Sequence, residues 1–278
     1  MKKILLLFPF LFFVATLVAQ TPSSGEINII SFNIRYDNPD DGMNAWVFRK
    51  EAVSRMINTE RPDVLGIQEA LAGQMDYLKL YCPDYECAGI GREDGVSKGE
   101  YAAIFWLKSR FSLIDSGHFW LSETPQIPSK GWDAACHRMV TWVQLADKES
   151  GKELFVFNTH LDHIGKVARE QSLLLISRKI KEIVGEMNLP VFLTGDFNSM
   201  TCDDIFNPLK TLLSSAREAT DNTDDSNTYN GFGTDSDLID HIFYVNATPL
   251  KFKVMNSSYG VNYISDHYPV KGTFLINK

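Results

Sequence analysis

The stretch Val191-Phe192-Leu193-Thr194-Gly195-Asp196-Phe197-Asn198 begins as a short apolar run and ends in a carboxylate and an amide. A run of this length beside turn-forming residues predicts a buried strand. Asp196 and Asn198 are then expected at the rim of the core, where loops from several strands meet. A single residue of this kind is most often a turn or capping residue, so the interpretation depends on whether other strands end in the same way.

The same arrangement recurs along the chain. Polar side chains that can bind a metal or move a proton stand at the end or the start of other apolar runs: Asn33, Glu69, His160, Asp266 and His267. Their repetition at strand ends favours one shared site over a series of unrelated turns.

Apolar periodicity places strands and helices around these residues. Strands are predicted at 27–34, 63–68, 101–107, 139–145, 154–158, 191–194, 239–245, 250–254 and 268–275. Helices are predicted at 47–58 and 166–187, and the second carries an apolar stripe at three- and four-residue steps. Consecutive strands with interspersed helices indicate a mixed α/β or α+β domain with much antiparallel pairing. The polar run 221–237 is predicted to be a surface loop, and residues 20–278 a single domain.

The N-terminus has the pattern of an export signal. Lys2 and Lys3 precede an apolar run at 4–18, which is short for a membrane span and is followed by Ala19-Gln20-Thr21. We therefore expect residues 1–19 to be a signal peptide and the mature protein to be secreted or periplasmic. An uncleaved membrane anchor is the alternative.

Composition excludes several classes of protein. With 278 residues, 44% hydrophobic and 22% charged, the chain is an ordinary globular one. Its formal net charge of −8 argues against tight, unspecific binding to long nucleic acids, because that binding depends on Lys and Arg. Four cysteines are too few for a disulfide scaffold, and Cys82 and Cys87 are the nearest pair.

The residue types at the strand ends suit one kind of chemistry. Glu69, the aspartates, Asn33 and Asn198 offer hard oxygen ligands, which fit Mg²⁺, Mn²⁺ or Ca²⁺ better than zinc. His160 and His267 can donate and accept protons near neutral pH. Together they predict metal-dependent hydrolysis of a phosphoester.

Seven strings, in their order, resemble the endonuclease/exonuclease/phosphatase superfamily, which has the fold of pancreatic-type deoxyribonuclease. They are Ser31-Phe32-Asn33-Ile34-Arg35, Ile67-Gln68-Glu69, Gly99-Glu100-Tyr101, Asn158-Thr159-His160, Gly195-Asp196-Phe197-Asn198, Ile239-Asp240-His241-Ile242-Phe243 and Ser265-Asp266-His267-Tyr268-Pro269-Val270. The resemblance runs from about Ile27 to the C-terminus. The segments 119–125 and 131–138 are similar to a secreted bacterial branch of that superfamily.

The resemblance implies an α+β fold, a four-layer α/β/β/α sandwich of two packed mixed β-sheets. It also implies a metal held by Glu69, with Asn33 and Asp266 beside it. In-line attack by water then needs no covalent intermediate.

The resemblance also assigns roles to the other polar residues. Asp196 and Asn198 would activate the water and bind phosphoryl oxygens, and His160, oriented by Glu100, would protonate the leaving oxygen. His267 would contact the phosphate and be held by Asp266. Asp240 would be a further ligand or a carboxylate that orients a histidine.

Arg138 is a candidate phosphate clamp, since a guanidinium can grip two oxygens, although a structural ion pair explains it equally well. Trp120 and Trp132 are candidates for the substrate cleft or, more commonly, for the core. The expected partner is a phosphoester substrate, and the protein is expected to be a monomer.

Other readings of the sequence are weaker. Thr159-His160-Leu161-Asp162-His163-Ile164-Gly165 is similar to the zinc loop of metallo-β-lactamases, but Asn158 stands where a ligand histidine is needed. Gly95-Val96-Ser97-Lys98-Gly99 lacks the strand and helix that a serine nucleophile requires. A catalytically dead binding protein on the same fold is disfavoured because every expected polar position is filled.

The substrate is less well defined by the sequence. A small phosphodiester or nucleic-acid fragment is slightly favoured over a phospholipid head group or a sugar phosphate. Sphingomyelinase-like and phosphoinositide phosphatase activities remain alternatives.

Overall fold

The computed structural model describes residues 25–186 and 188–276. The predicted signal peptide, residues 1–19, lies outside the described residues, as does Met187 at the end of the second predicted helix. Within the described part of the chain, no helix combines the length and the apolar character needed to cross a bilayer.

The described residues form two six-stranded mixed sheets. The first sheet has the order β11-β12-β1-β2-β4-β3, and only β1 and β2 run parallel in it. Its strands are β1 (Glu26–Asn33), β2 (Val64–Ala70), β3 (Tyr85–Ala88), β4 (Tyr101–Leu107), β11 (Thr248–Val254) and β12 (Val270–Leu275).

The second sheet has the order β5-β6-β7-β8-β10-β9, and here only β7 and β8 run parallel. Its strands are β5 (Phe111–Trp120), β6 (Met139–Asp147), β7 (Glu153–His160), β8 (Val191–Asp196), β9 (Ser214–Ser215) and β10 (Asp240–Val245). Each sheet therefore has one parallel pair of strands, and the two strands of a pair have their carboxyl ends at the same end of the sheet.

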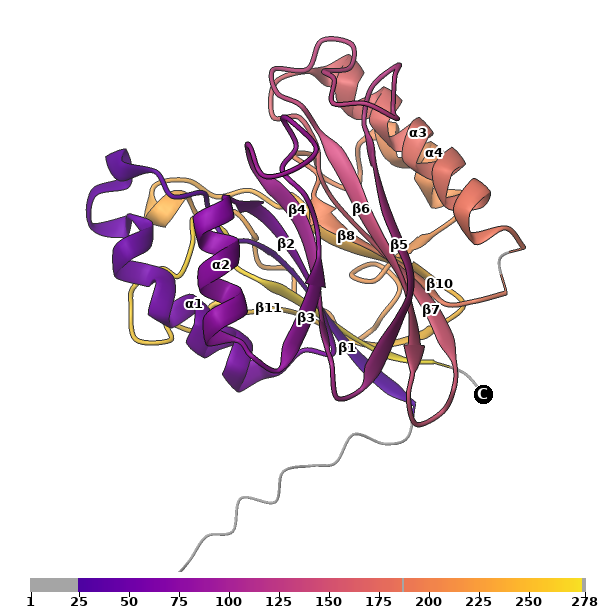
Figure 1. The fold of residues 1–278 in the computed structure, drawn as a ribbon, viewed down its shortest axis with the longest axis horizontal. Helices are drawn as coiled ribbons and strands as arrows, with labels where there is room; N and C mark the ends of the chain where they lie inside the picture. Colours follow the sequence, from indigo (N-terminus) through magenta and orange to yellow (C-terminus); the bar gives the residue numbers. More distant parts are fainter. Residues whose placement is uncertain (1–24, 187, 277–278) are drawn as a thin grey trace, which may run out of the picture.

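Helices cover the outer face of each sheet, as Figure 1 shows, with α1 and α2 on one side and α3 and α4 on the other. Their bounds are α1 (Trp46–Glu60), α2 (Ala72–Tyr81), α3 (Lys166–Val184) and α4 (Asn207–Lys210), and short 3₁₀ turns lie at Pro39–Asn44, Asp204–Phe206 and Gly231–Gly233. The predicted four-layer α/β/β/α sandwich is confirmed.

Three apolar clusters separate the four layers. Val53 and Met56 of α1 pack on the first sheet at Phe32. The facing sides of the two sheets meet through a second cluster that includes Ile29, Val156 and Phe192. Residues from α3 pack on the second sheet, and they include Leu173, Ile176 and Ile180 of the predicted stripe. Burial of apolar area at these three interfaces is the main force that stacks the layers.

A buried polar cluster joins the two sheets at Asn158 of β7. Its Nδ2 donates to the carbonyls of Ile67 and Ala103 in the first sheet. Its Oδ1 accepts from Gln68 Nε2 at 2.7 Å and from Thr194 Oγ1 at 2.9 Å. Every polar atom of this amide is satisfied, so the cluster fixes how the sheets align just below their shared edge.

The structure contains elements that periodicity did not predict. The helix α2 has a glycine and several polar residues, and β5 exposes most of its side chains, so neither shows a clear apolar pattern. The polar run 221–237 was predicted to be a surface loop, and this is wrong for its centre, where Thr228 and Asn230 are buried. They are buried because the backbone here bonds to Asp237, before β10, and to Asp266 and Tyr268, before β12.

Candidate active site

The predicted site residues meet at the edge where β1, β2, β7 and β8 end. A pocket of about 550 Å³ there is lined by eight of them: Glu69, Glu100, Arg138, His160, Asp196, Asn198, Asp266 and His267. Asn33 and Asp240 lie directly behind this wall and bond to it. Parallel strands bring their carboxyl ends to one edge, which explains why residues far apart in sequence share the pocket.

Glu69 is turned into the pocket by an irregularity in β2. The pairing of β2 with β4 shifts register between Ile67 and Ala70, and Glu69 has a φ of 67°. A bulge of this kind redirects a side chain, and a left-handed conformation at a non-glycine residue often marks a functional site. The carboxylate is held at both oxygens, by Asn33 Nδ2 at 3.0 Å and by the backbone N–H of Tyr36 at 3.1 Å.

Asn33 connects the acidic groups and is itself fully buried. Its Nδ2 donates to Glu69 and to Asp196 Oδ2, at 3.0 Å each, while its Oδ1 accepts from the backbone N–H of Arg35. An NH₂ group cannot coordinate a cation, and Asn33 turns its NH₂ group toward both carboxylates. This geometry differs from the expectation that Asn33 is a metal ligand, and it makes Asn33 a residue that positions two carboxylates.

Asp196 lies at the centre of the site. Its Oδ2 is 3.3 Å from His160 Nε2 and 3.7 Å from His267 Nε2. Burial, together with the nearby charge of Asp240, raises the pKa of Asp196 above its usual range. A carboxyl group with a raised pKa is better suited to accept a proton from water.

His267 is oriented by Asp240, not by its sequence neighbour Asp266. His267 Nδ1 is 2.8 Å from Asp240 Oδ2. Burial opposes the imidazolium, but the carboxylates of Asp240 and Asp196 more than offset it and raise the pKa of His267 to about 10. Asp266 instead faces Arg35, with Asp266 Oδ2 at 3.6 Å from Arg35 Nη1. The expectation that Asp266 holds His267 is therefore wrong, because adjacent side chains in this segment point to different partners.

His160 has the opposite electrostatic environment. Burial and the nearby guanidinium of Arg138 hold the pKa of His160 well below its usual value. Asn198 Nδ2 lies 3.2 Å from His160 Nε2 and also donates to the carbonyl of Leu161 at 3.0 Å. The two histidines of the site thus differ in charge, since His267 is an imidazolium and His160 a neutral imidazole at neutral pH.

Glu100 is close to His160 but is bonded elsewhere. Its oxygens accept from Arg92 Nη1 at 2.6 Å and Nη2 at 2.8 Å, and Glu100 Oε2 is 3.9 Å from His160 Nδ1. Burial and the charge of Glu69 raise the pKa of Glu100. Glu100 therefore does not orient His160 through a direct hydrogen bond, as the resemblance implied. Its carboxylate is held instead by the bidentate pair with Arg92.

The donor set fits a hard divalent cation. Ligand atoms of Glu69, His160 and Asp196 all lie within 4.8 Å of one another. The carboxylates of Glu100 and Asp266 also line the pocket, so negative charge is concentrated there. Carboxylate oxygens are the preferred ligands of Mg²⁺, Mn²⁺ and Ca²⁺. Glu69 is the residue that would hold such an ion, with Asp196 and His160 next to it, whereas Asp266 is not part of that group.

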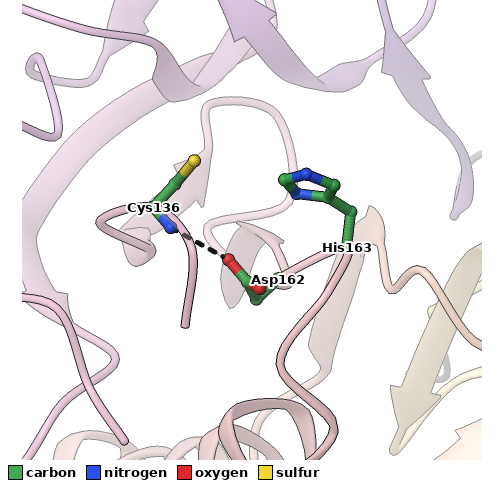
Figure 2. Close-up of side chains that lie close together, drawn as sticks. All are labelled: Cys136, Asp162 and His163. Carbon is green, nitrogen blue, oxygen red and sulfur yellow. Dashed lines mark hydrogen bonds between the residues drawn. The ribbon is translucent and has the colours of Figure 1, made fainter. Parts of the chain in front are cut away.

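A second cluster, Cys136, Asp162 and His163, also has metal-binding residue types (Figure 2). The Asp162 carboxylate, however, already accepts from four backbone N–H groups and from Arg138 Nε. The Arg138 guanidinium also contacts His163 and adds positive charge beside the cluster. The lone pairs of Asp162 and the charge of Arg138 do not fit a bound metal ion. The interpretation of residues 159–165 as a zinc loop is therefore not supported.

Several residues of the pocket were not found from the sequence. Arg35, Arg92, His163 and Tyr229 line it, and the buried Arg49 donates to the carbonyls of Ile34, Arg35 and Ile264. Arg35 ends the string Ser31–Arg35 and His163 belongs to the string compared with a zinc loop, but neither was given a role in the site. No local pattern marks the others. Neither Trp120 nor Trp132 is among the residues that line the pocket, and both pack in apolar clusters.

Known proteins resemble this chain over most of its length. A model of the Endonuclease/Exonuclease/phosphatase family matches residues 30–267. An endonuclease/exonuclease/phosphatase from Bacteroides vulgatus is 37% identical with a TM-score of 0.86, over 91% of this chain and 99% of that one. A mannosyl-6-phosphatase from Bacteroides thetaiotaomicron is 35% identical with a TM-score of 0.85, over 90% and 99%.

A viral relative is more distant in sequence. The uncharacterised protein L388 of Acanthamoeba polyphaga mimivirus is 27% identical over 250 residues, which cover 81% of this chain and 90% of that protein.

Proposed function

Because this chain belongs to the endonuclease/exonuclease/phosphatase family, whose members hydrolyse phosphoesters, we propose that it is an exported, divalent-metal-dependent phosphatase of sugar phosphates or similar polyol phosphates. Its export rests on the signal pattern in the first residues, Lys2 to Thr21. Its metal dependence rests on the carboxylate of Glu69 and on the acidic groups that surround it in the pocket.

The distribution of charge around the pocket carries the choice of substrate. Arg35, Arg92 and Arg138 line the pocket, but each is paired with a carboxylate, so their charge favours one phosphate group and not several. Asp235 and Asp237 line the pocket from the exposed loop before β10. Carboxylates accept hydrogen bonds from hydroxyl groups but repel further phosphates. A substrate with one phosphate and several hydroxyls suits both the arginines and the aspartates of the pocket. A polynucleotide does not, because the aspartates repel its further phosphates. The similarity to a protein named mannosyl-6-phosphatase supports the same choice.

Each part of the site has a role in this reaction. A divalent cation at Glu69 supplies positive charge for the phosphoryl oxygens. Asp196 accepts a proton from the attacking water, since its raised pKa favours this. His267, charged and held by Asp240, neutralises a phosphoryl oxygen. His160, whose Nε2 lies between Asn198 Nδ2 and Asp196 Oδ2, is on the side that we assign to the leaving oxygen.

A substrate panel tests this function. Purified protein is assayed with hexose 6-phosphates, p-nitrophenyl phosphate, bis-p-nitrophenyl phosphate, short oligonucleotides, phosphoinositides and sphingomyelin, each with Mg²⁺, Mn²⁺ or chelator. We expect the highest kcat/KM with a hexose phosphate and loss of turnover with chelator. Preference for the diester or the oligonucleotides would instead support the phosphodiesterase reading that the sequence slightly favoured.

A further inference from the structure

Arg138 and His163 form one wall of the pocket, backed by Asp162, and neither belongs to the group of possible metal ligands Glu69, His160 and Asp196. Figure 2 shows the side chains of Cys136 and His163 on the same side of the Asp162 carboxylate. Arg138 and His163 both line the pocket that also contains His160. Nothing in the reaction described above uses His163, so its arrangement needs its own explanation.

Asp162 anchors this wall. One of its oxygens accepts from Ile164 N at 3.0 Å and Gly165 N at 2.7 Å, and the other accepts from Ala135 N, Cys136 N and Arg138 Nε. Only 4% of the Arg138 residue is exposed. The guanidinium therefore has one orientation, because leaving the buried Asp162 without its partner would be costly.

Arg138 determines the tautomer of His163. Arg138 Nη2 lies 3.0 Å from His163 Nδ1. A guanidinium has donors and no acceptor, so Nδ1 of His163 must accept and cannot carry a proton. The ring proton is then on Nε2, at the far end of the imidazole.

The Nε2–H of His163 is available to a ligand. His163 is exposed, in contrast to the buried His160 three residues earlier, and it lines the same pocket. Among the described residues, no hydrogen bond of His163 Nε2 to another group is present. A donor of fixed direction at the rim of a phosphate-binding pocket suits an oxygen acceptor on the part of the substrate that leaves.

We propose that His163 is a specificity residue that donates its Nε2–H to a hydroxyl or ring oxygen of the sugar, and that Arg138 is a positioning residue that sets its tautomer. This inference rests on the proposed function, since it concerns the leaving group of the same reaction. It gives the pocket a way to distinguish a sugar phosphate from an aryl phosphate that lacks such oxygens.

Two amide variants of His163 distinguish the role of Nδ1, which faces Arg138, from the role of Nε2, which faces the substrate. His163→Asn keeps an acceptor near Arg138 but has no donor at the position of Nε2, whereas His163→Gln places an NH₂ group near that position. The readout is kcat/KM for a hexose phosphate divided by kcat/KM for p-nitrophenyl phosphate. We expect His163→Asn and His163→Ala to lower this ratio about tenfold, the effect of one hydrogen bond, and His163→Gln to retain most of it. His137→Asn, in the loop beside Arg138 but outside the pocket lining, is the matched control.

A spectroscopic measurement tests the tautomer independently of activity. Nitrogen-15 shifts of His163 should show an unprotonated Nδ1 in the wild type, and Arg138→Met should return the ring to a mixture of tautomers. The inference is wrong if His163→Asn leaves the ratio unchanged, if it lowers turnover of both substrates equally, or if Nδ1 is protonated. If the wild type hydrolyses aryl phosphates but no sugar phosphate, the proposed function itself is wrong and the inference falls with it.

Discussion

His267 Nδ1 lies 2.8 Å from Asp240 Oδ2, so a buried imidazole at the centre of the site has a carboxylate on the side away from the pocket. The pair spans two segments, the start of β10 and the loop before β12. Its consequence is a positive charge that points at the place where a phosphate would bind.

Asp240→Asn should remove that charge at working pH. The carboxylate is the first of the groups that raise the pKa of His267 to about 10, so its loss lowers that pKa. The alkaline limb of the kcat/KM profile, where His267 loses its proton, should therefore move to lower pH, with roughly hundredfold less turnover at pH 8. Asp76→Asn, at an exposed position of α2 outside the pocket lining, is the control. An unmoved alkaline limb in Asp240→Asn would contradict the assignment.

Glu69→Gln should raise the metal concentration that gives half-maximal activity. The carboxylate is fixed by Asn33 and Tyr36 and lies within 4.8 Å of ligand atoms of His160 and Asp196. The amide keeps the shape but loses the charge that a hard cation requires. Activity is titrated with Mg²⁺ and Mn²⁺, beside Glu60→Gln, whose carboxylate bonds to Tyr259 and Lys271 instead. An unchanged metal requirement would exclude Glu69 as a ligand.

His160→Ala should lower kcat by about a hundredfold while the metal requirement stays the same. The imidazole contacts Asp196 and Asn198 and lines the pocket, so its loss affects the proton network directly. Turnover and metal titration are measured on the same preparation. Wild-type turnover in this variant would show that His160 takes no part in the reaction.

Gly66→Ala tests the polar cluster that joins the sheets. A Cβ at this position would lie 2.2 Å from Thr194 Oγ1 and 2.7 Å from Asn158 Oδ1, so the buried amide would have to move. We expect a loss of about 3 kcal/mol in the free energy of unfolding, from strain and broken buried hydrogen bonds. Gly73→Ala in α2, where a Cβ meets nothing within 4 Å, is the control and should be neutral or stabilising in urea unfolding. Equal stability of the two variants would mean that the sheets adjust freely at this point.

The strands that end in Asn33, Glu69, His160 and Asp196 could be predicted from local sequence, because an apolar run followed by a polar residue is a short-range pattern. The carboxylate that orients His267 could not be predicted in this way. Asp240 lies behind His267 because β10 pairs antiparallel with β8 and places Asp240 opposite Asp196, a register that no local pattern records. Sequence proximity suggested Asp266 instead.

Side chains that hydrogen-bond to the backbone of distant segments could not be predicted from local sequence either. Arg49 is in the middle of α1 and donates to carbonyls of the loop after β1, more than ten residues away. Thr228 Oγ1 accepts from the backbone N–H groups of Ile239 and Asp240, so a residue in a polar run fixes the start of β10. Such roles depend on the tertiary fold and leave no periodic trace in the sequence.

His241 gives a prediction about stability at low pH. Its ring is buried against Phe197, Phe206 and Phe243. Burial lowers the pKa of His241 to about 4, although its bond to the Ser199 carbonyl partly opposes this. The folded protein thus binds the proton less readily than the unfolded chain, whose histidines titrate near about 6.5. Stability is therefore unaffected by this group above about pH 6.5 and is lost as the pH falls from there toward 4.

The loss attributable to His241 should reach about 3 kcal/mol between these two pH values. His241→Gln keeps a donor for the Ser199 carbonyl but cannot titrate, so its unfolding free energy should fall less than that of the wild type over this range. Urea unfolding at several pH values measures the difference. Parallel curves for His241→Gln and the wild type would mean that His241 is protonated equally in the folded and unfolded states.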